Sequence, residues 1–178
     1  MILKGKKVIL RPVRMDDAPR FVKWFNDSEV YQFVITKGIK LKDEREWIKQ
    51  RIEGKIKDDL FLCIDTKAGA HIGSIGLHKI NKRNKNASFG ITIGDKKYWN
   101  RGLGSEAAQL IINYGFKKLK LHRIDLDVYS DNPRAIKVYK RLGFKKEGTK
   151  RDHRLWKGKY YNSYFMAILD REWKRKRN

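Results

Sequence analysis

Alternating apolar and polar residues predict that the chain begins with a strand followed by a helix. Residues 6–13, KKVILRPV, alternate as in a strand with one buried face. Asp16 or Asp17 can then cap a helix that ends near residues 26–27. The apolar side chains of this helix are Phe21, Val22, Trp24 and Phe25.

The next segment predicts a second helix and an antiparallel meander. A helix over residues 43–53 would carry Trp47, Ile48 and Ile52 on one face and stop at Gly54. Turn-rich segments, KAGA and NKRNKN, separate the strand candidates that follow. These candidates are residues 60–66, 72–80 and 87–93.

The second half of the chain predicts two more helices and three more strands. Apolar residues recur at helical spacing from about residue 102 to 119, which indicates a long helix with one buried stripe. The segment HRIDLDVY alternates like a strand, and DNPRAIKVYKRLG reads as a capped, glycine-ended helix. Two strands, 149–156 and 161–169, are joined by a KGK turn. The order of elements therefore indicates an α/β (α+β) fold.

Composition supports one folded domain over residues 1–178. The hydrophobic fraction of 40% supplies a core, so a mean hydropathy of -0.71 reflects a charged surface. Cys63 is the single cysteine and cannot form an internal disulfide, which favours a reducing, cytoplasmic setting. No apolar stretch is long enough for a membrane helix, so no membrane association is expected. A net charge of +23 attracts polyanions, including RNA and the phosphates of nucleotides.

Two glycines at the start of the long helix are candidates for a phosphate site. In YWNRGLGSEAAQ, Gly102 and Gly104 directly follow a strand and a loop. Glycine lets main-chain N–H groups approach a ligand, and a helix N-terminus carries partial positive charge. A tight turn into a helix would show the same residues, so this segment alone leaves both interpretations open.

The segment DNPRAIKVY holds two further candidates. Asn132 and Pro133 suit the cap and first position of a helix, so Asn132 is explained by capping alone. Tyr139 shares a helix face with apolar residues, so a core aromatic is the simplest interpretation. Neither residue points to chemistry without further context.

The segments WNRGLGSEA, DNPRAIKVY and LGFKKEG occur in that order, and together with KKVILRPV and NDSEV they resemble the GCN5-related N-acetyltransferase (GNAT) superfamily. The resemblance covers nearly the whole chain and is greatest to ribosomal-protein N-terminal acetyltransferases and spermidine N-acetyltransferases. It implies a mixed central sheet of six to seven strands, mostly antiparallel and splayed between the fourth and fifth strands. About four helices would flank this sheet.

The resemblance implies acetyl-CoA as co-substrate and no metal. Main-chain donors of the phosphate signature would hold the diphosphate, with charge added by its arginine: Arg101, Gly102, Leu103, Gly104 and Ser105. The family usually has Gln or Arg where this chain has Trp99. Asn132 would bond the pantetheine arm, and a main-chain N–H near Ile91, Thr92 and Ile93 would polarise the thioester carbonyl.

For catalysis, the resemblance assigns Tyr139 as the general acid that protonates the departing CoA thiolate. A primary alkylamine, with a pKa of about 10.4, must also lose a proton before it can attack. The family often uses a Glu at the position of Ser88, so the usual base is missing. The sequence leaves four candidates open, of which the first two are carried as catalytic residues: His78, Asp127, Asp125 and Glu29. A base that acts through ordered water, with acetyl-CoA and the amine simply held in line, is also open.

The expected activity is transfer of an acetyl group to a primary amine. His78 and Lys79 would repel a polyamine, so a protein N-terminus, as in the ribosomal-protein enzymes, or another small amine is favoured. The positive charge predicts weak electrostatic association with RNA, and the family resemblance allows a homodimer. The alternative is a non-catalytic module that binds CoA, RNA or an acidic protein on the same scaffold.

Overall fold

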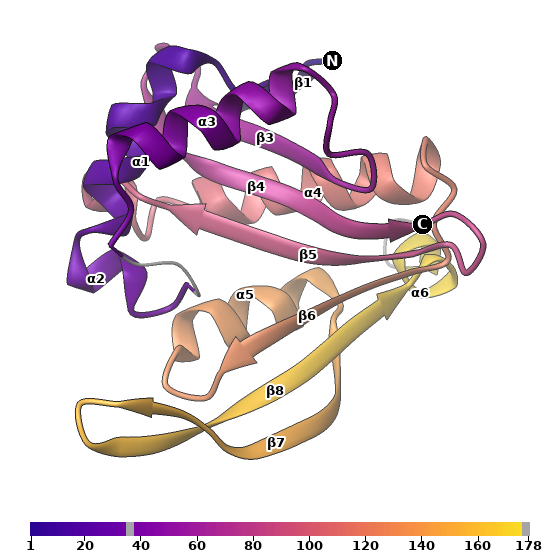
Figure 1. Cartoon of the computed structure of the whole chain (residues 1–178). Helices are drawn as coiled ribbons and strands as arrows, with labels where there is room; N and C mark the ends of the chain where they lie inside the picture. The colour runs from indigo at the N-terminus through magenta and orange to yellow at the C-terminus, as the bar shows by residue number, and fades with distance from the viewer. Residues whose placement is uncertain (35–37, 176–178) are drawn as a thin grey trace. The chain divides into compact units, whose positions relative to one another are not determined.

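The computed structural model describes residues 1–34 and 38–175 (Figure 1). In these residues, eight strands are hydrogen-bonded in the order β1-β2-β3-β4-β5-β6-β8-β7. The strands are β1 (Leu3–Lys4), β2 (Val8–Arg11), β3 (Leu60–Thr66), β4 (His71–Asn81), β5 (Asn86–Ile93), β6 (Arg123–Tyr129), β7 (Lys145–Trp156) and β8 (Lys159–Leu169). The six α-helices of the same residues are α1 (Ala18–Phe25), α2 (Ser28–Tyr31), α3 (Leu41–Ile52), α4 (Leu103–Lys117), α5 (Pro133–Leu142) and α6 (Asp170–Arg175).

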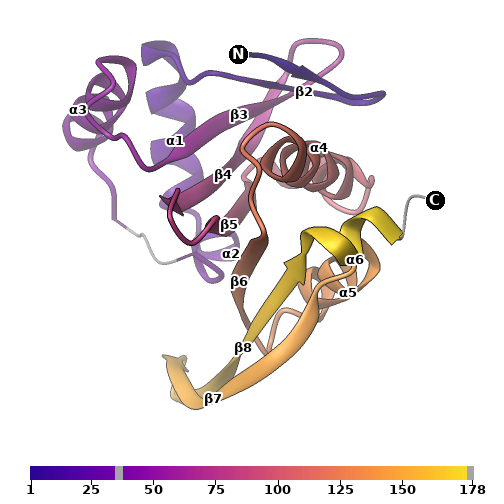
Figure 2. The ribbon, with the colours of Figure 1, turned by 90° about the vertical axis from the view of Figure 1, so that its right-hand side faces the viewer.

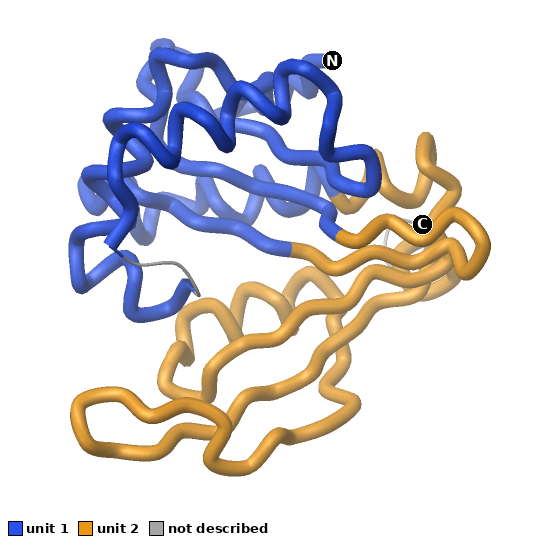
Figure 3. Tube along the Cα trace, viewed as in Figure 1, with its two compact units in different colours: residues 1–78, 90–111 blue, residues 79–89, 112–178 orange. Residues whose placement is uncertain are grey.

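The chain divides into two compact units (Figure 3). Unit 1 comprises residues 1–78 and 90–111, and unit 2 comprises residues 79–89 and 112–178. The boundaries fall inside β4, β5 and α4, so each unit contains part of these elements. The single domain inferred from the sequence stays a prediction.

Unit 1 is an antiparallel arrangement covered by helices on both faces. Strands β2, β3 and β4 pair antiparallel in sequence order, which confirms the β3–β4 step of the predicted meander, and β5 follows β4 in the order of the sheet. Within this unit, α1 and α3 lie on one face of the strands and the start of α4 lies on the other (Figures 1 and 2). On the face that α1 and α3 cover, the core of unit 1 is an aromatic cluster with few polar atoms. It includes Phe21, Trp24, Val30, Ile48 and Cys63, with Trp47, Phe61 and Trp99 at its edge.

Unit 2 is built on the antiparallel strands β6, β8 and β7. Lys157 and Gly158, both with positive φ, form the two-residue turn between β7 and β8, as the KGK segment predicted. The start of β5 pairs with β6 in parallel, over three residue pairs that end at Ser88 and Asp125. The sheet is therefore mixed and mostly antiparallel, with its one parallel pairing at the point where the sequence predicted a splay.

The sequence predictions need four corrections in the described residues. Eight strands replace six to seven, because a short β1 precedes β2, and six helices replace four, because α2 and α6 are brief. Ile52 is 56% exposed, since the buried stripe of α3 runs through Glu44 and Ile48. Asp17 stands at the start of α1, but its carboxylate makes no capping bond because it binds Arg11. No helix among the described residues has the length and apolar character needed to cross a membrane.

Glu44 is a carboxylic acid buried in the first turn of α3, with 6% of its surface exposed. Burial raises the pKa of Glu44 from its ordinary value of 4.5 to about 7, and the charge of Arg51 only partly opposes this rise. The folded state holds the carboxyl proton of Glu44 more tightly than the unfolded state does. This proton therefore stabilises the folded protein fully below pH 4.5. The stabilisation is lost as the pH rises through 7.

We expect Glu44→Gln to stabilise the protein at pH 8, where the wild type buries a charge. The gain should be at most about 3 kcal/mol, since one pKa unit corresponds to about 1.4 kcal/mol. Denaturant unfolding at pH 8 and pH 4 measures it, and the difference between variant and wild type should vanish at pH 4. A gain of equal size at both pH values would contradict the role of the carboxyl proton.

Candidate functional site

The start of α4 presents main-chain donors to solvent. Gly102 has a φ of +76°, a left-handed conformation that favours glycine, and a Cβ built on it would meet nothing within 4 Å. The first helical hydrogen bond runs from the N–H of Glu106 to the carbonyl of Gly102. The N–H groups of Leu103, Gly104 and Ser105 therefore have no partner within the helix. This open helix start can bind the diphosphate of a nucleotide.

Gly104 joins this helix start to the end of β5. A Cβ on Gly104 would lie 3.4 Å from a side-chain carbon of Ile93 and 3.7 Å from one of Ile91. These are ordinary van der Waals distances, so α4 is packed closely against the strand at this point. The structure thus brings together two predicted groups of unit 1, the glycine-bearing turn and the strand that holds Ile91, Thr92 and Ile93.

Trp99 fixes the loop between β5 and α4. Its Nε1–H donates to the carbonyl oxygen of Ile93 at 2.7 Å, and its ring packs at the edge of the aromatic cluster of unit 1. At this position the family usually has a Gln or Arg that contacts phosphate. In this chain the position is Trp99, which instead fixes the loop in place. The main-chain donors are therefore held by packing rather than by a charged neighbour.

Arg101 supplies the charge beside these donors. Its guanidinium carbon lies 5.6 Å from the ring centre of Tyr98, and the side chain is exposed. Within the described residues, Arg101 forms no ion pair with a carboxylate. Its charge is available to a phosphate, and the residues of this turn fit the diphosphate of acetyl-CoA.

Asn132 and Tyr139 lie in unit 2, on α5. The side-chain oxygen of Asn132 accepts a hydrogen bond from the N–H of Ala135 at 3.1 Å, which confirms the predicted cap. Because capping uses only the oxygen, the amide nitrogen keeps two donors for another acceptor.

The ring of Tyr139 stands edge-on to Phe89, with ring centres 5.9 Å apart, and contacts Phe144 at 5.9 Å. Burial raises the pKa of Tyr139 to about 12. In the described part of the chain, no group hydrogen-bonds to its hydroxyl. Tyr139 is thus both the core aromatic of the simple interpretation and a phenol that keeps its proton at neutral pH, as a general acid must.

The carboxylates proposed as bases are paired with other groups. Asp127 forms an exposed ion pair with Lys150 at 2.9 Å, and Glu29 lies 3.0 Å from the amine of Lys96. Asp125 accepts a hydrogen bond from Ser88 at 2.7 Å. These contacts explain all three side chains without catalysis.

His78 differs from these candidates because a buried carboxylate orients it. The Nδ1 of His78 pairs with one oxygen of Asp59, and Arg51 pairs with the other. Sequence reasoning missed Asp59 and Arg51. Asp59 sits in the turn KIKDDLF before β3, and nothing in the spacing of residues 51, 59 and 78 links them.

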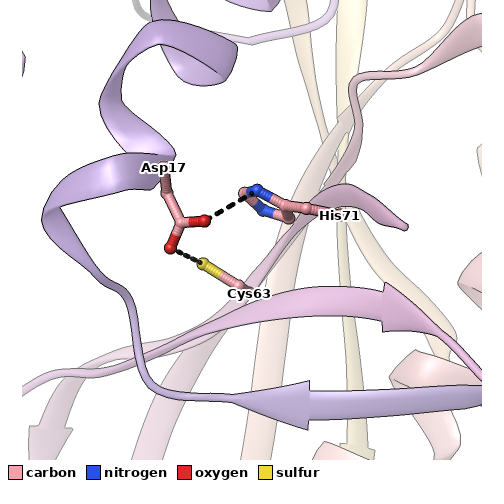
Figure 4. A group of neighbouring side chains, drawn as sticks. All are labelled: Asp17, Cys63 and His71. Atoms are coloured by element: carbon pink, nitrogen blue, oxygen red, sulfur yellow. Dashed lines mark hydrogen bonds and ion pairs between the residues drawn. The ribbon is translucent and has the colours of Figure 1, made fainter. Parts of the chain in front are cut away.

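A second cluster of ionisable residues lies inside unit 1 (Figure 4). An oxygen of Asp17 lies 3.1 Å from Nδ1 of His71, and Cys63 donates to the other at 3.4 Å. Both oxygens also bind Arg11, at 2.7 and 2.8 Å, and burial raises the pKa of the Cys63 thiol. A guanidinium on the carboxylate and a protonated thiol leave poor metal ligands, so this cluster ties β2, β3 and β4 to the start of α1.

Three comparisons agree with this geometry. The chain is 31% identical over 176 residues to the uncharacterized N-acetyltransferase p20 of Bacillus licheniformis, covering 96% of this chain and 97% of p20. It is 38% identical over 108 residues to the L-amino acid N-acetyltransferase AaaT of Escherichia coli K12, covering 61% of this chain and 65% of AaaT. The fold matches that of spermidine N-acetyltransferase from Vibrio cholerae, solved with CoA and spermine, with a TM-score of 0.87, 22% identity and coverage of 96% and 99%.

The protein-family model of the acetyltransferase (GNAT) domain matches residues 7–145 of the chain. The chain belongs to the GNAT acetyltransferase family and is an acetyl-CoA-dependent N-acetyltransferase. The alternative of a non-catalytic module is therefore set aside.

We expect Gly102→Ala to raise the KM for acetyl-CoA at least tenfold, because a methyl group would enter the open space beside the main-chain donors. The matched control is Gly69→Ala in the turn between β3 and β4, with a φ of +83° and equally open surroundings. Both substitutions should cost about 1–2 kcal/mol of folding free energy through the same backbone strain. Equal KM values in the two variants would show that the turn at Gly102 does not bind the co-substrate.

Proposed function

We propose that this enzyme acetylates an α-amino group, that of a protein N-terminus, in a ternary complex with acetyl-CoA. The observation that carries the proposal is the open helix start at Gly102 to Ser105 with the unpaired Arg101 beside it. In the proposed reaction these residues hold the diphosphate, and Asn132 bonds the pantetheine arm. The main chain at Ile91 to Ile93 polarises the thioester carbonyl, and Tyr139 protonates the leaving thiolate.

The choice of an α-amine follows from acid–base chemistry. An α-amino group has a pKa of about 7.7–8.0, so roughly a tenth of it is neutral at pH 7, whereas an alkylamine with a pKa of about 10.4 is almost fully protonated. A chain that lacks the usual Glu at Ser88 suits the amine that is easier to deprotonate. AaaT is an L-amino acid N-acetyltransferase, which supports the same class of amine, and a free L-amino acid is the second candidate on that ground.

The charge of the protein argues against a polycation as acceptor. The chain carries a net charge of +23, and Lys79 follows His78 on β4. Like charges would raise the free energy of a bound polyamine, whereas acidic residues after the N-terminus of a peptide would be attracted. The same attraction is proposed to concentrate the enzyme near RNA, and hence near ribosomes, where new N-termini emerge.

We expect Tyr139→Phe to lower kcat for any accepted amine by at least about tenfold, since general acid catalysis contributes about 10²–10⁴-fold. The KM for acetyl-CoA should change little, because the ring contacts to Phe89 and Phe144 remain. Thiol release from acetyl-CoA measures both constants. Tyr160→Phe, which alters a 59% exposed phenol on β8, is the matched control and should behave as wild type. Unchanged kcat in Tyr139→Phe would remove this hydroxyl from the mechanism.

Substrate preference is tested with hexapeptides that share an N-terminal serine and carry acidic or basic residues next to it, together with free L-amino acids and spermidine. Acidic peptides should have a kcat/KM about tenfold above basic ones at low salt, with the difference shrinking at physiological salt. N-terminally blocked peptides are the control and should give no turnover. Preference for spermidine would overturn the assignment to α-amines.

A further inference from the structure

The imidazole of His78 packs against two glycines, Gly76 on β4 and Gly90 on β5, which have no side chains to obstruct it. A Cβ on Gly76 would come within 2.6 Å of Nε2 of His78, and one on Gly90 would come within 3.3 Å. The imidazole therefore lies over both glycines, and its Nε2 is next to Gly90. Gly90 directly precedes the segment of β5 proposed to polarise the thioester.

Asp59 holds this imidazole in one orientation. Its carboxylate pairs through Oδ1 with Nδ1 of His78 and through Oδ2 with Arg51. The side chain of Asp59 is 10% exposed, against 36% for His78. Burial alone would raise the pKa of Asp59, but hydrogen bonds from His78 and Arg51 hold it below its ordinary value, so the carboxylate stays ionised.

Arg51 is in turn fixed by aromatic rings. Its guanidinium carbon lies 4.1 Å from the ring centre of Trp47 and 4.8 Å from that of Phe61. These two rings stand edge to face, with centres 4.9 Å apart. The aromatic cluster of unit 1 thus determines where the carboxylate of Asp59 points.

The orientation fixes which ring nitrogen of His78 can react. An ionised carboxylate only accepts hydrogen bonds, so Nδ1 must carry a proton and donate it to Asp59. In a neutral imidazole the lone pair is then on Nε2, the nitrogen next to Gly90. A histidine oriented by a carboxylate in this way is the arrangement that general bases use.

We propose that His78 is the general base of the acetyl transfer and that Asp59 is its positioning residue. The proposal rests on the proposed function. Nε2 of His78 takes a proton from the substrate ammonium group, and Asp59 stabilises the imidazolium that forms. The freed nitrogen bonds to the acetyl carbonyl carbon, the C–S bond breaks with its electron pair on sulfur, and Tyr139 gives its proton to that thiolate. The second proton of the acylated nitrogen returns to the Tyr139 oxygen, and the proton on Nε2 passes to water.

This base explains why a chain with Ser88 can still be active. Side chains of alternate residues share one face of a strand, so positions 88 and 90 of β5 lie on the same face. A glutamate at position 88 would project from that face. In this chain Gly90 admits the imidazole of His78 from the neighbouring strand to that face instead.

The test compares four proteins in thiol-release assays with acetyl-CoA and either the N-terminal serine hexapeptides or L-methionine. His78→Gln should lower kcat about 100-fold with little change in the KM for acetyl-CoA, and Asp59→Asn about tenfold. His122→Gln removes the imidazole of an exposed His–Asp pair in unit 2, 3.2 Å from Asp170, and should match wild type.

Two further readouts separate catalysis from folding. In proton NMR spectra, the wild type should show a downfield Nδ1–H signal that disappears in both His78→Gln and Asp59→Asn. Added imidazole should restore part of the activity of His78→Ala, which a purely structural histidine would not allow.

The outcomes distinguish the two proposals. Full kcat in His78→Gln, beside an active wild type, overturns the base role and leaves the proposed function standing. A wild type that acetylates spermidine but neither peptides nor amino acids overturns the proposed function, and the same variants assayed with spermidine then decide the base role. Loss of activity without imidazole rescue also counts against His78.

Discussion

The contact between the start of α4 and the end of β5 is the constraint on which the rest of the enzyme depends. Gly104 lets the helix approach within van der Waals distance of Ile91 and Ile93, and Trp99 ties the intervening loop to the Ile93 carbonyl. The unpaired N–H groups of the helix are thereby fixed next to the strand that would hold the thioester. In the proposed mechanism, binding and activation of the acetyl donor both depend on this packing contact.

The proposed acid and the proposed base depend on different kinds of contact. The phenol of Tyr139, protonated at neutral pH even at its ordinary pKa of 10, is buried against apolar rings that raise its pKa to about 12, and no described group hydrogen-bonds to its hydroxyl. His78, by contrast, is defined by a chain of polar contacts through Asp59 to Arg51. An imidazole is a moderate base, which suits an α-amine better than an alkylamine. The absence of a glutamate at position 88, an imidazole as the proposed base and an α-amine as the proposed substrate are therefore consistent with one another.

Much of the fold could be predicted from the sequence, and the base network could not. Periodicity placed the long strands and α4 because local side-chain spacing reports directly on buried faces. The glycines of the helix start were found because their neighbours in sequence are also their neighbours in space. Asp59 reaches His78, and Arg51 reaches Asp59, only because α3, β3 and β4 fold onto one another, and no local pattern records that. In the sequence, Trp99 indicated only the loss of the phosphate contact that Gln or Arg usually makes in the family. The hydrogen bond and the packing of Trp99 are visible only in the structure.

The central claim is that main-chain donors at the start of α4 bind the diphosphate of acetyl-CoA. Isothermal titration calorimetry of the folded wild-type protein with acetyl-CoA, CoA and dephosphorylated pantetheine tests it most directly. Acetyl-CoA and CoA should bind saturably, and pantetheine, which lacks the diphosphate, should bind much more weakly. Equal affinity for all three ligands, or no binding of acetyl-CoA, would contradict it.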